Sequence, residues 1–313
     1  MTPHFVTYFD SHYAAQGIAM LQSLRTWCPG AAVTVLCLDD TMLHILRTWF
    51  PCGVKSLTIA QILELESRLV ELQASRTPWE FYATTKPLVI RHVMEAEVVP
   101  DDWVAFLDAD TYFFSSPREA FAEIPAHAST VLSPHRFSHE NSELEKYGTY
   151  NAGFGLWRHD ALGKAVLADW TARCLEWCFN RVEDGRFMNQ AYLNAWPQEH
   201  EGVMVLTHPG FNLAPWNLGG HVLQQSPEGM QVDEEPLVFF HFSSVSRRDC
   251  GTWQTFYTNP EMSQCTVLDG IYEPYLRQLE IISERLMRKH GIAGVGTQRK
   301  VDPTTPMLVL RSP

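Results

Sequence analysis

The 313-residue chain lacks several features that would indicate other classes of protein. It has no uninterrupted apolar run of the roughly 18 residues that a membrane-spanning helix needs. Neither G-x-x-x-x-G-K nor G-x-G-x-x-G occurs, which excludes the glycine-rich P-loop and dinucleotide-binding loops. Basic side chains are few, 24 Lys and Arg against 36 Asp and Glu, so the formal net charge is −12. Nucleic acid is therefore not an expected partner, because neutralising its phosphates requires clustered Lys and Arg.

The chain also shows no targeting segment and no disulfide framework. The apolar stretch at residues 4–9 is too short, and too polar at its ends, for a signal peptide. The seven cysteines are odd in number and scattered along the chain, which is typical of a reduced protein. We therefore expect a cytoplasmic protein without a transmembrane segment.

Short apolar strands alternate with helices in the first half of the chain. Strands are predicted at 4–9, 32–38, 54–59 and 103–107, with helices at 13–27, 42–50 and 79–96 between them. The strand at 32–38 is a nearly continuous apolar run, as a sheet covered on both faces requires. This β-α-β order predicts a parallel, Rossmann-like α/β sheet with helices on both faces.

The second half is more mixed. Strands are predicted at 130–132, 154–157, 203–206 and 237–242, and helices at 161–182, 189–195 and 267–289. Segment 207–235 is rich in Gly, Pro and Asn, which predicts a long ordered loop over a site and a contribution to an acceptor site. We predict one domain over residues 1–245, followed by a C-terminal helical extension and tail over 246–313.

Two acidic residues follow directly after the predicted strand at 103–107. Asp108 and Asp110 are two positions apart, and extended backbone points such side chains to the same side. Both carboxylates therefore face the edge where open α/β sheets bind ligands. Two neighbouring carboxylates repel each other without a cation, and their oxygens suit Mg²⁺ or Mn²⁺. The alternative is that they only cap the turn into Thr111.

His241 lies in another predicted strand, 237–242, and precedes the polar Ser243. A neutral imidazole would add a nitrogen ligand to the two carboxylates, which favours Mn²⁺ over Mg²⁺. The alternative for His241 is a packed histidine at the end of a strand.

The order and spacing of these motifs resemble the GT-A glycosyltransferases. Asp108-Ala109-Asp110 is similar to their D-x-D signature, and the resemblance extends over residues 5–242. The whole set is most similar to nucleotide-diphospho-sugar transferases related to the retaining galactosyl- and glucosyltransferases. The resemblance implies a GT-A fold, which is a mixed, Rossmann-like α/β sheet flanked by helices. It also implies a divalent metal, a nucleotide-sugar donor carried by UDP, and a glycan or other hydroxyl acceptor.

The resemblance also gives roles to single residues. Those of the first strand and the turn after it, which would receive the base and ribose, are Thr7, Tyr8, Phe9, Asp10 and Tyr13. Those that would line the donor sugar are Asn151, Ala152 and Gly153. Asp108, Asp110 and His241 would hold the metal. Lys86 would bring a cation to the donor, the alternative being a solvated surface lysine.

Trp216, within the predicted loop, offers a flat face for a sugar ring or fills the core beneath the loop. The chain departs from the resembling family at Asn189-Gln190, where the family has Asp-Gln near the reacting carbon of the donor sugar. An asparagine side chain cannot act as a base or nucleophile, although it still forms hydrogen bonds. Asp184 is the nearby carboxylate that could compensate, or else a turn residue before Gly185.

These features predict a metal-dependent glycosyltransferase with a retaining mechanism, in which Lys86, Asp184, Asn189 and Gln190 are the candidate catalytic residues. Two alternatives remain. A sugar nucleotidyltransferase would use a similar sheet, but residues 8–12 lack the glycine-rich loop of that class. A non-catalytic sugar-nucleotide or glycan binder is suggested by Asn189.

Overall fold

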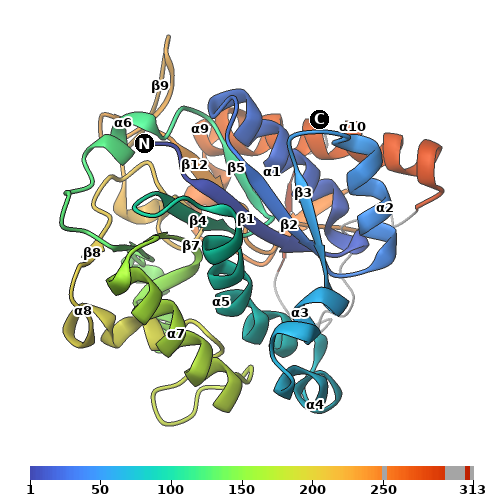
Figure 1. Cartoon of the computed structure of the whole chain (residues 1–313). Helices are drawn as coiled ribbons and strands as arrows, with labels where there is room; N and C mark the ends of the chain where they lie inside the picture. The colour runs from blue at the N-terminus through green and yellow to red at the C-terminus, as the bar shows by residue number, and fades with distance from the viewer. Residues whose placement is uncertain (249–251, 293–306, 311–313) are drawn as a thin grey trace.

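The computed structural model describes residues 1–248, 252–292 and 307–310, and centres on a seven-stranded sheet (Figure 1). Its strands, in spatial order, are β3 (Lys55–Thr58), β2 (Val33–Cys37), β1 (His4–Phe9), β4 (Trp103–Leu107), β7 (Tyr150–Arg158), β6 (Thr130–Pro134) and β8 (Val203–Val205). Strands β3, β2, β1 and β4 run parallel, as the first half of the sequence predicts. Strand β7 is antiparallel to β4 and to β6, so the sheet as a whole is mixed.

Side chains alternate along the strands and build one hydrophobic core on each face of the sheet. In β1, Phe5 and Phe9 belong to one core and Val6 to the other. In β4, Leu107 belongs to the first core and Phe106 to the second. Because both faces are covered, the central strands are mostly apolar, and the charged side chains of the site lie beyond their ends.

Helices cover both faces (Figure 1). The first core includes side chains of α1 (Ala14–Trp27), α2 (Asp40–Trp49) and α10 (Glu273–His290). The second includes those of α5 (Pro78–Glu97) and α7 (Ala161–Glu176). Two helices that the sequence does not predict, α3 (Ile59–Leu65) and α4 (Arg68–Ser75), connect β3 to α5. The short α-helices are α6 (Arg118–Ala122), α8 (Trp196–Glu199) and α9 (Cys265–Val267).

Three small sheets, several 3₁₀ segments and one π turn complete the described chain. The sheets are β5 (Thr111–Phe113) with β12 (Phe239–His241), β9 (Leu223–Ser226) with β10 (Gly229–Val232) and β11 (Glu235–Pro236), and β13 (Ser246–Arg247) with β14 (Trp253–Thr255) and β15 (Leu308–Leu310). The 3₁₀ turns are η1 (Ser11–Tyr13), η2 (His139–Tyr147), η3 (Ala191–Ala195), η4 (Leu218–Gly220) and η5 (Pro260–Ser263), and η6 (Leu268–Tyr272) is a π turn. The β5–β12 pair brings the late part of the chain to the end of β4.

The predicted helix over 161–182 is wrong at its end, because α7 stops at Glu176. Trp177 is extended, with φ −145° and ψ 123°, and the buried Arg76 takes over the free carbonyls of the last turn. Its guanidinium donates to the carbonyl oxygens of Cys174 and Leu175, at 2.7 and 3.0 Å. A distant residue therefore ends this helix, and no local sequence signal does so.

Segment 207–235 is not the continuous loop that its composition predicts, because it contains the β9–β10 hairpin.

The part after residue 245 is not only helical, since β13, β14 and β15 lie there with α10. Helix α10 lies against α1, where Gln278 Nε2 donates to Gln22 Oε1 at 2.7 Å. The boundary at 245/246 stays a prediction, and most of the tail from 291 lies outside the described residues. Among the described helices, none is both long enough and apolar enough to cross a membrane.

Replacing Gly163 by alanine tests the packing of α7 against the end of β7. A Cβ atom at Gly163 would collide with the Arg158 carbonyl oxygen and lie 3.1 Å from the Ser129 carbonyl oxygen. We expect Gly163→Ala to lower the melting temperature by roughly 3 to 10 °C, since backbone must move to admit the methyl group. Calorimetry would measure it. Gly220→Ala is the control, because no atom lies within 4 Å of its Cβ position; equal melting temperatures for both variants would contradict this packing.

Candidate functional site

The carboxylate pair flanks the turn between β4 and β5. The backbone N–H of Asp108 donates to the Gly153 carbonyl of β7 at 2.8 Å. The Asp110 carbonyl accepts the N–H of Phe242 at 2.7 Å. Backbone hydrogen bonds therefore connect the turn to the main sheet on one side and to the residue after β12 on the other. Both acids lie at the carboxyl end of β4, where the sequence predicts them.

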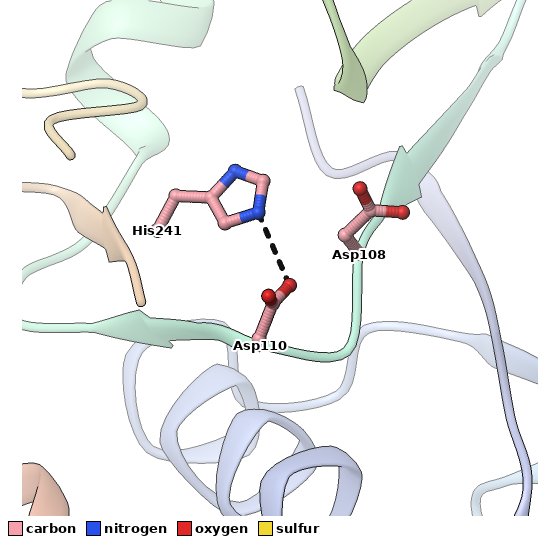
Figure 2. A group of neighbouring side chains, drawn as sticks. All are labelled: Asp108, Asp110 and His241. Carbon is pink, nitrogen blue, oxygen red and sulfur yellow. Dashed lines mark ion pairs between the residues drawn. The ribbon is translucent and has the colours of Figure 1, made fainter. Parts of the chain in front are cut away.

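His241 is the last residue of β12 and lies opposite Thr111 in the β5–β12 pair. Its Nε2 is 3.1 Å from Oδ1 of Asp110, and Figure 2 shows the two side chains pointing toward each other beside Asp108. One ligand atom from each of these three residues lies within 4.8 Å of the other two. His241 Nδ1 is 3.2 Å from Oδ1 of the buried Asn212. This contact orients the ring so that Nε2 faces the carboxylates.

The charges of Asp110 and His241 stabilise each other. Burial would lower the pKa of His241, but the charge and hydrogen bond of Asp110, together with the charge of Asp108, outweigh burial and raise that pKa above its usual value. Burial would likewise raise the pKa of Asp110, yet the charge and hydrogen bond of His241 bring it below its usual value. A cation bound at this point would replace the proton on His241 as the partner of the carboxylate.

Lys86 is buried and is not a surface lysine. Its Nζ donates to Oδ1 of Asp108 at 3.0 Å and to the Ala152 carbonyl at 2.9 Å. The ammonium also lies 4.2 Å from the centre of the Phe106 ring, within the range of a cation–π contact. Each carboxylate of the pair therefore has one cationic neighbour, Lys86 for Asp108 and His241 for Asp110.

Gly153 leaves room at the centre of this group. A Cβ atom there would lie 2.7 Å from Oδ2 of Asp108 and 2.7 Å from Cε1 of His241. A side chain at this position would therefore fill the space between Asp108 and His241. Only a glycine leaves this space open without moving Asp108 or His241.

The group opens into a cleft of about 830 Å³. Of the residues that the sequence singles out, those lining it are Tyr8, Phe9, Asp10, Tyr13, Lys86, Asp108, Ala109, Asp110, Asn151, Ala152, Gly153, Asn189, Gln190, Trp216 and His241. Thr7 and Asp184 are not among them. Thr7 is buried within β1, and Asp184 is exposed in a turn and pairs with Arg186 at 3.3 Å. The structure therefore does not bring Asp184 to the site as a substitute carboxylate.

The side-chain amides of Asn189 and Gln190 contact backbone groups. Gln190 Oε1 accepts the N–H of Ala152 at 3.2 Å, and its Nε2 donates to the Tyr147 carbonyl at 3.1 Å. Asn189 Nδ2 donates to the Ala83 carbonyl of α5 at 3.0 Å. Both residues line the cleft, and both also connect its walls.

The sequence does not predict the wall that the chain directly after β6 contributes to the cleft. His135 and Phe137 line the cleft, and their rings stack at 4.5 Å. Trp216 is buried, donates from Nε1 to the His135 carbonyl at 3.1 Å and lies edge-on to His241. It is the one lining residue from segment 207–235 within the described chain. The available signal was the position of His135 directly after a strand end, as for Asp108.

The buried His135 generates a prediction about the pH dependence of stability. Burial, and then the charge of His241, lower the pKa of His135 to about 3 from 6.5. The unfolded chain takes up a proton between these values and the folded chain does not, so stability falls as the pH drops below about 6.5. Between pH 7 and pH 5 this amounts to about 2 kcal/mol. We expect His135→Asn to lose that much less stability than wild type over this interval in urea titrations.

The control is His127→Asn at an exposed position, which should follow the pH profile of the wild type. An unchanged profile in His135→Asn would contradict the assignment of a neutral, buried His135.

Comparison with known proteins identifies relatives and the fold. No family model matches the chain. Two uncharacterized proteins of Bacillus subtilis (strain 168) are similar to it. YfnD is 29% identical over 293 residues, 89% of each chain, and YfnF is 28% identical over 253 residues, 78% of this chain and 82% of the relative.

Two solved structures share the arrangement of helices and strands. The galactosyltransferase LgtC, in complex with donor and acceptor sugar analogs, superposes with a TM-score of 0.53 at 14% identity, covering 89% of this chain and 95% of that one. The apo-form glycosyltransferase GlyE of Streptococcus pneumoniae TIGR4 gives 0.51 at 13% identity, covering 95% and 66%. The chain has the GT-A fold, with Asp108, Asp110 and His241 at the carboxyl edge of its mixed sheet.

Proposed function

We propose that this protein is a metal-dependent glycosyltransferase that moves a sugar from a UDP-sugar donor to a hydroxyl group of a glycan acceptor. The convergence of Asp108, Asp110 and His241 at the cleft of a GT-A fold carries this proposal. Two carboxylates and one imidazole make a mixed oxygen and nitrogen ligand set, which suits Mn²⁺ and also accepts Mg²⁺.

The charge of the cleft supports a metal. A nucleoside diphosphate brings negative charge to a site that already holds two carboxylates. Among the described residues that line the cleft, Lys86 is the one Lys or Arg, and it is already paired with Asp108. Side chains alone therefore supply too little positive charge for the diphosphate. A bound divalent cation would neutralise the charge that develops on the departing diphosphate.

The walls of the cleft suit the two halves of a sugar-nucleotide reaction. We assign Tyr8, Asp10 and Tyr13, which line the cleft in and after β1, to the nucleoside, and Asn151 and Gly153 to the donor sugar. On the outer wall, Tyr147 and Phe187 have ring centres 4.6 Å apart and line the cleft. Such aromatic surfaces pack against the apolar faces of sugar rings, so we assign the acceptor to this side.

The shortage of carboxylates in the cleft, beyond the two predicted metal ligands, favours retention of configuration. Asp108 and Asp110 would be occupied by the metal, and the other carboxylate among the described lining residues, Asp10, accepts the N–H of Tyr13 at 3.0 Å. Asn189 takes up no proton. In the step we propose, the acceptor oxygen bonds to the anomeric carbon as the bond to the diphosphate oxygen breaks. The acceptor proton passes to that phosphate oxygen, so no protein base is required.

A non-catalytic sugar-nucleotide binder is the second candidate, and it rests on Asn189 standing where the resembling family has aspartate. The two candidates differ in turnover. A transferase hydrolyses or transfers sugar from a UDP-sugar in the presence of Mn²⁺, whereas a binder retains the donor intact.

Calorimetric titration of UDP with Mn²⁺ tests the site. We expect binding that chelation abolishes and that Asp110→Asn weakens by at least roughly 100-fold, because a metal ligand is lost. Glu71→Gln, on the exposed surface of α4, is the charge-matched control and should bind as wild type does. Equal affinities with Mn²⁺ and with chelator would contradict the metal-dependent proposal.

A further inference from the structure

Helix α5 contains a proline in its interior, at position 87. In an α-helix the N–H of residue 87 would donate to the carbonyl of Ala83, but proline has no N–H and its ring displaces that carbonyl. Ala83 is only 5% exposed, so its carbonyl is largely shielded from water. A buried carbonyl without a donor is costly, and a donor from outside the helix is therefore required.

Asn189 supplies that donor. Its Nδ2 lies 3.0 Å from the Ala83 carbonyl oxygen, across 106 positions of sequence. Asn189 is itself 5% exposed, and its backbone carbonyl accepts the indole N–H of Trp170 in α7 at 2.8 Å. The preceding Met188 has φ +48°, so the chain makes a local left-handed turn just before it presents this amide. Asn189 is therefore bound through its backbone to Trp170 of α7 and through its side chain to Ala83 of α5.

The broken turn of α5 also carries a residue of the site. Lys86 directly precedes Pro87, and its Nζ donates to Asp108 and to the Ala152 carbonyl. The position of this ammonium depends on how the turn from Ala83 to Pro87 is held. The hydrogen bond from Asn189 fixes that turn within the same buried layer.

We infer that Asn189 is a positioning residue that forms one unit with Pro87 and holds Lys86 against Asp108. A carboxylate at 189 has no N–H and would place its oxygens against the Ala83 carbonyl oxygen. The amide therefore supplies the donor that Pro87 lacks and that a carboxylate could not supply. The link to Asp108 rests on the proposed function, whereas the Pro87–Asn189 coupling does not.

A double-mutant cycle on thermal unfolding tests the coupling. We expect Asn189→Asp to lower the melting temperature of the full-length protein by roughly 2 to 6 °C, because the carbonyl loses its donor. In Pro87→Ala the new N–H at position 87 can bond to the Ala83 carbonyl. The same Asn189→Asp change should then cost less than half as much. Equal losses in the two backgrounds would overturn the inference.

Binding of Mn²⁺ alone, measured by calorimetry, tests the positioning role. We expect Asn189→Asp to raise the dissociation constant about 10-fold, and the Pro87→Ala/Asn189→Asp double variant to restore it to within about twofold. Val166→Ala, a cavity variant in the packing between α7 and the sheet, is the matched control for general destabilisation, and its Mn²⁺ affinity should match wild type. Unchanged affinity in Asn189→Asp would overturn the link to Asp108. Absence of Mn²⁺ binding in wild type would instead contradict the proposed function, and the thermal cycle would still decide the coupling.

Discussion

Asp108 and Asp110 bring two negative charges to the edge of a sheet whose interior is apolar on both faces, and the site depends on how these charges are compensated. Lys86 comes from α5 and His241 from β12, so the cations arrive from two distant parts of the chain. Charges enclosed by protein are stable only when they are paired. The ion pairs therefore join the helix layer, the main sheet and the β5–β12 ribbon at one point, where a divalent cation also has suitable ligands.

Helix α5 carries Lys86, and it also contains a proline in its interior. Thr77 begins the helix with a capping box shared with Glu80, and the interior Pro87 then breaks the hydrogen-bond ladder at the level of the site. A proline leaves the carbonyl four residues earlier without its helical donor, and a side chain from another segment can bind that carbonyl. Asn189 does so, which connects the loop after α7 to the turn that carries Lys86. The same residue thus lines the cleft and supports its wall.

The sequence predicts a large part of this molecule because its strongest patterns are local. The strands β1, β2 and β4 follow from short apolar runs, and the helices α1 and α5 from the longer segments between them, and the structure confirms them. The errors lie where distant contacts overrule local propensity. Arg76 binds the carbonyl of Cys174 in the last turn of α7, and this helix ends at residue 176, six residues before the predicted end at 182. Strand pairing within residues 223–232 forms a hairpin where a loop is predicted.

The sequence by itself determined that two carboxylates follow a buried strand, that a histidine closes a late strand, and that an asparagine replaces an expected aspartate. Its local patterns could not determine that His241 meets Asp110, which only the family resemblance implied, because that contact depends on β12 pairing with β5 across more than a hundred residues. Nor could it show that Asp184 turns to solvent or that Asn189 binds the Ala83 carbonyl. Local patterns specify which groups are available, whereas long-range strand pairing and helix packing specify which of them share a buried space. The physical reason is that a side-chain hydrogen bond requires two atoms within about 3 Å, a distance that only the folded backbone sets.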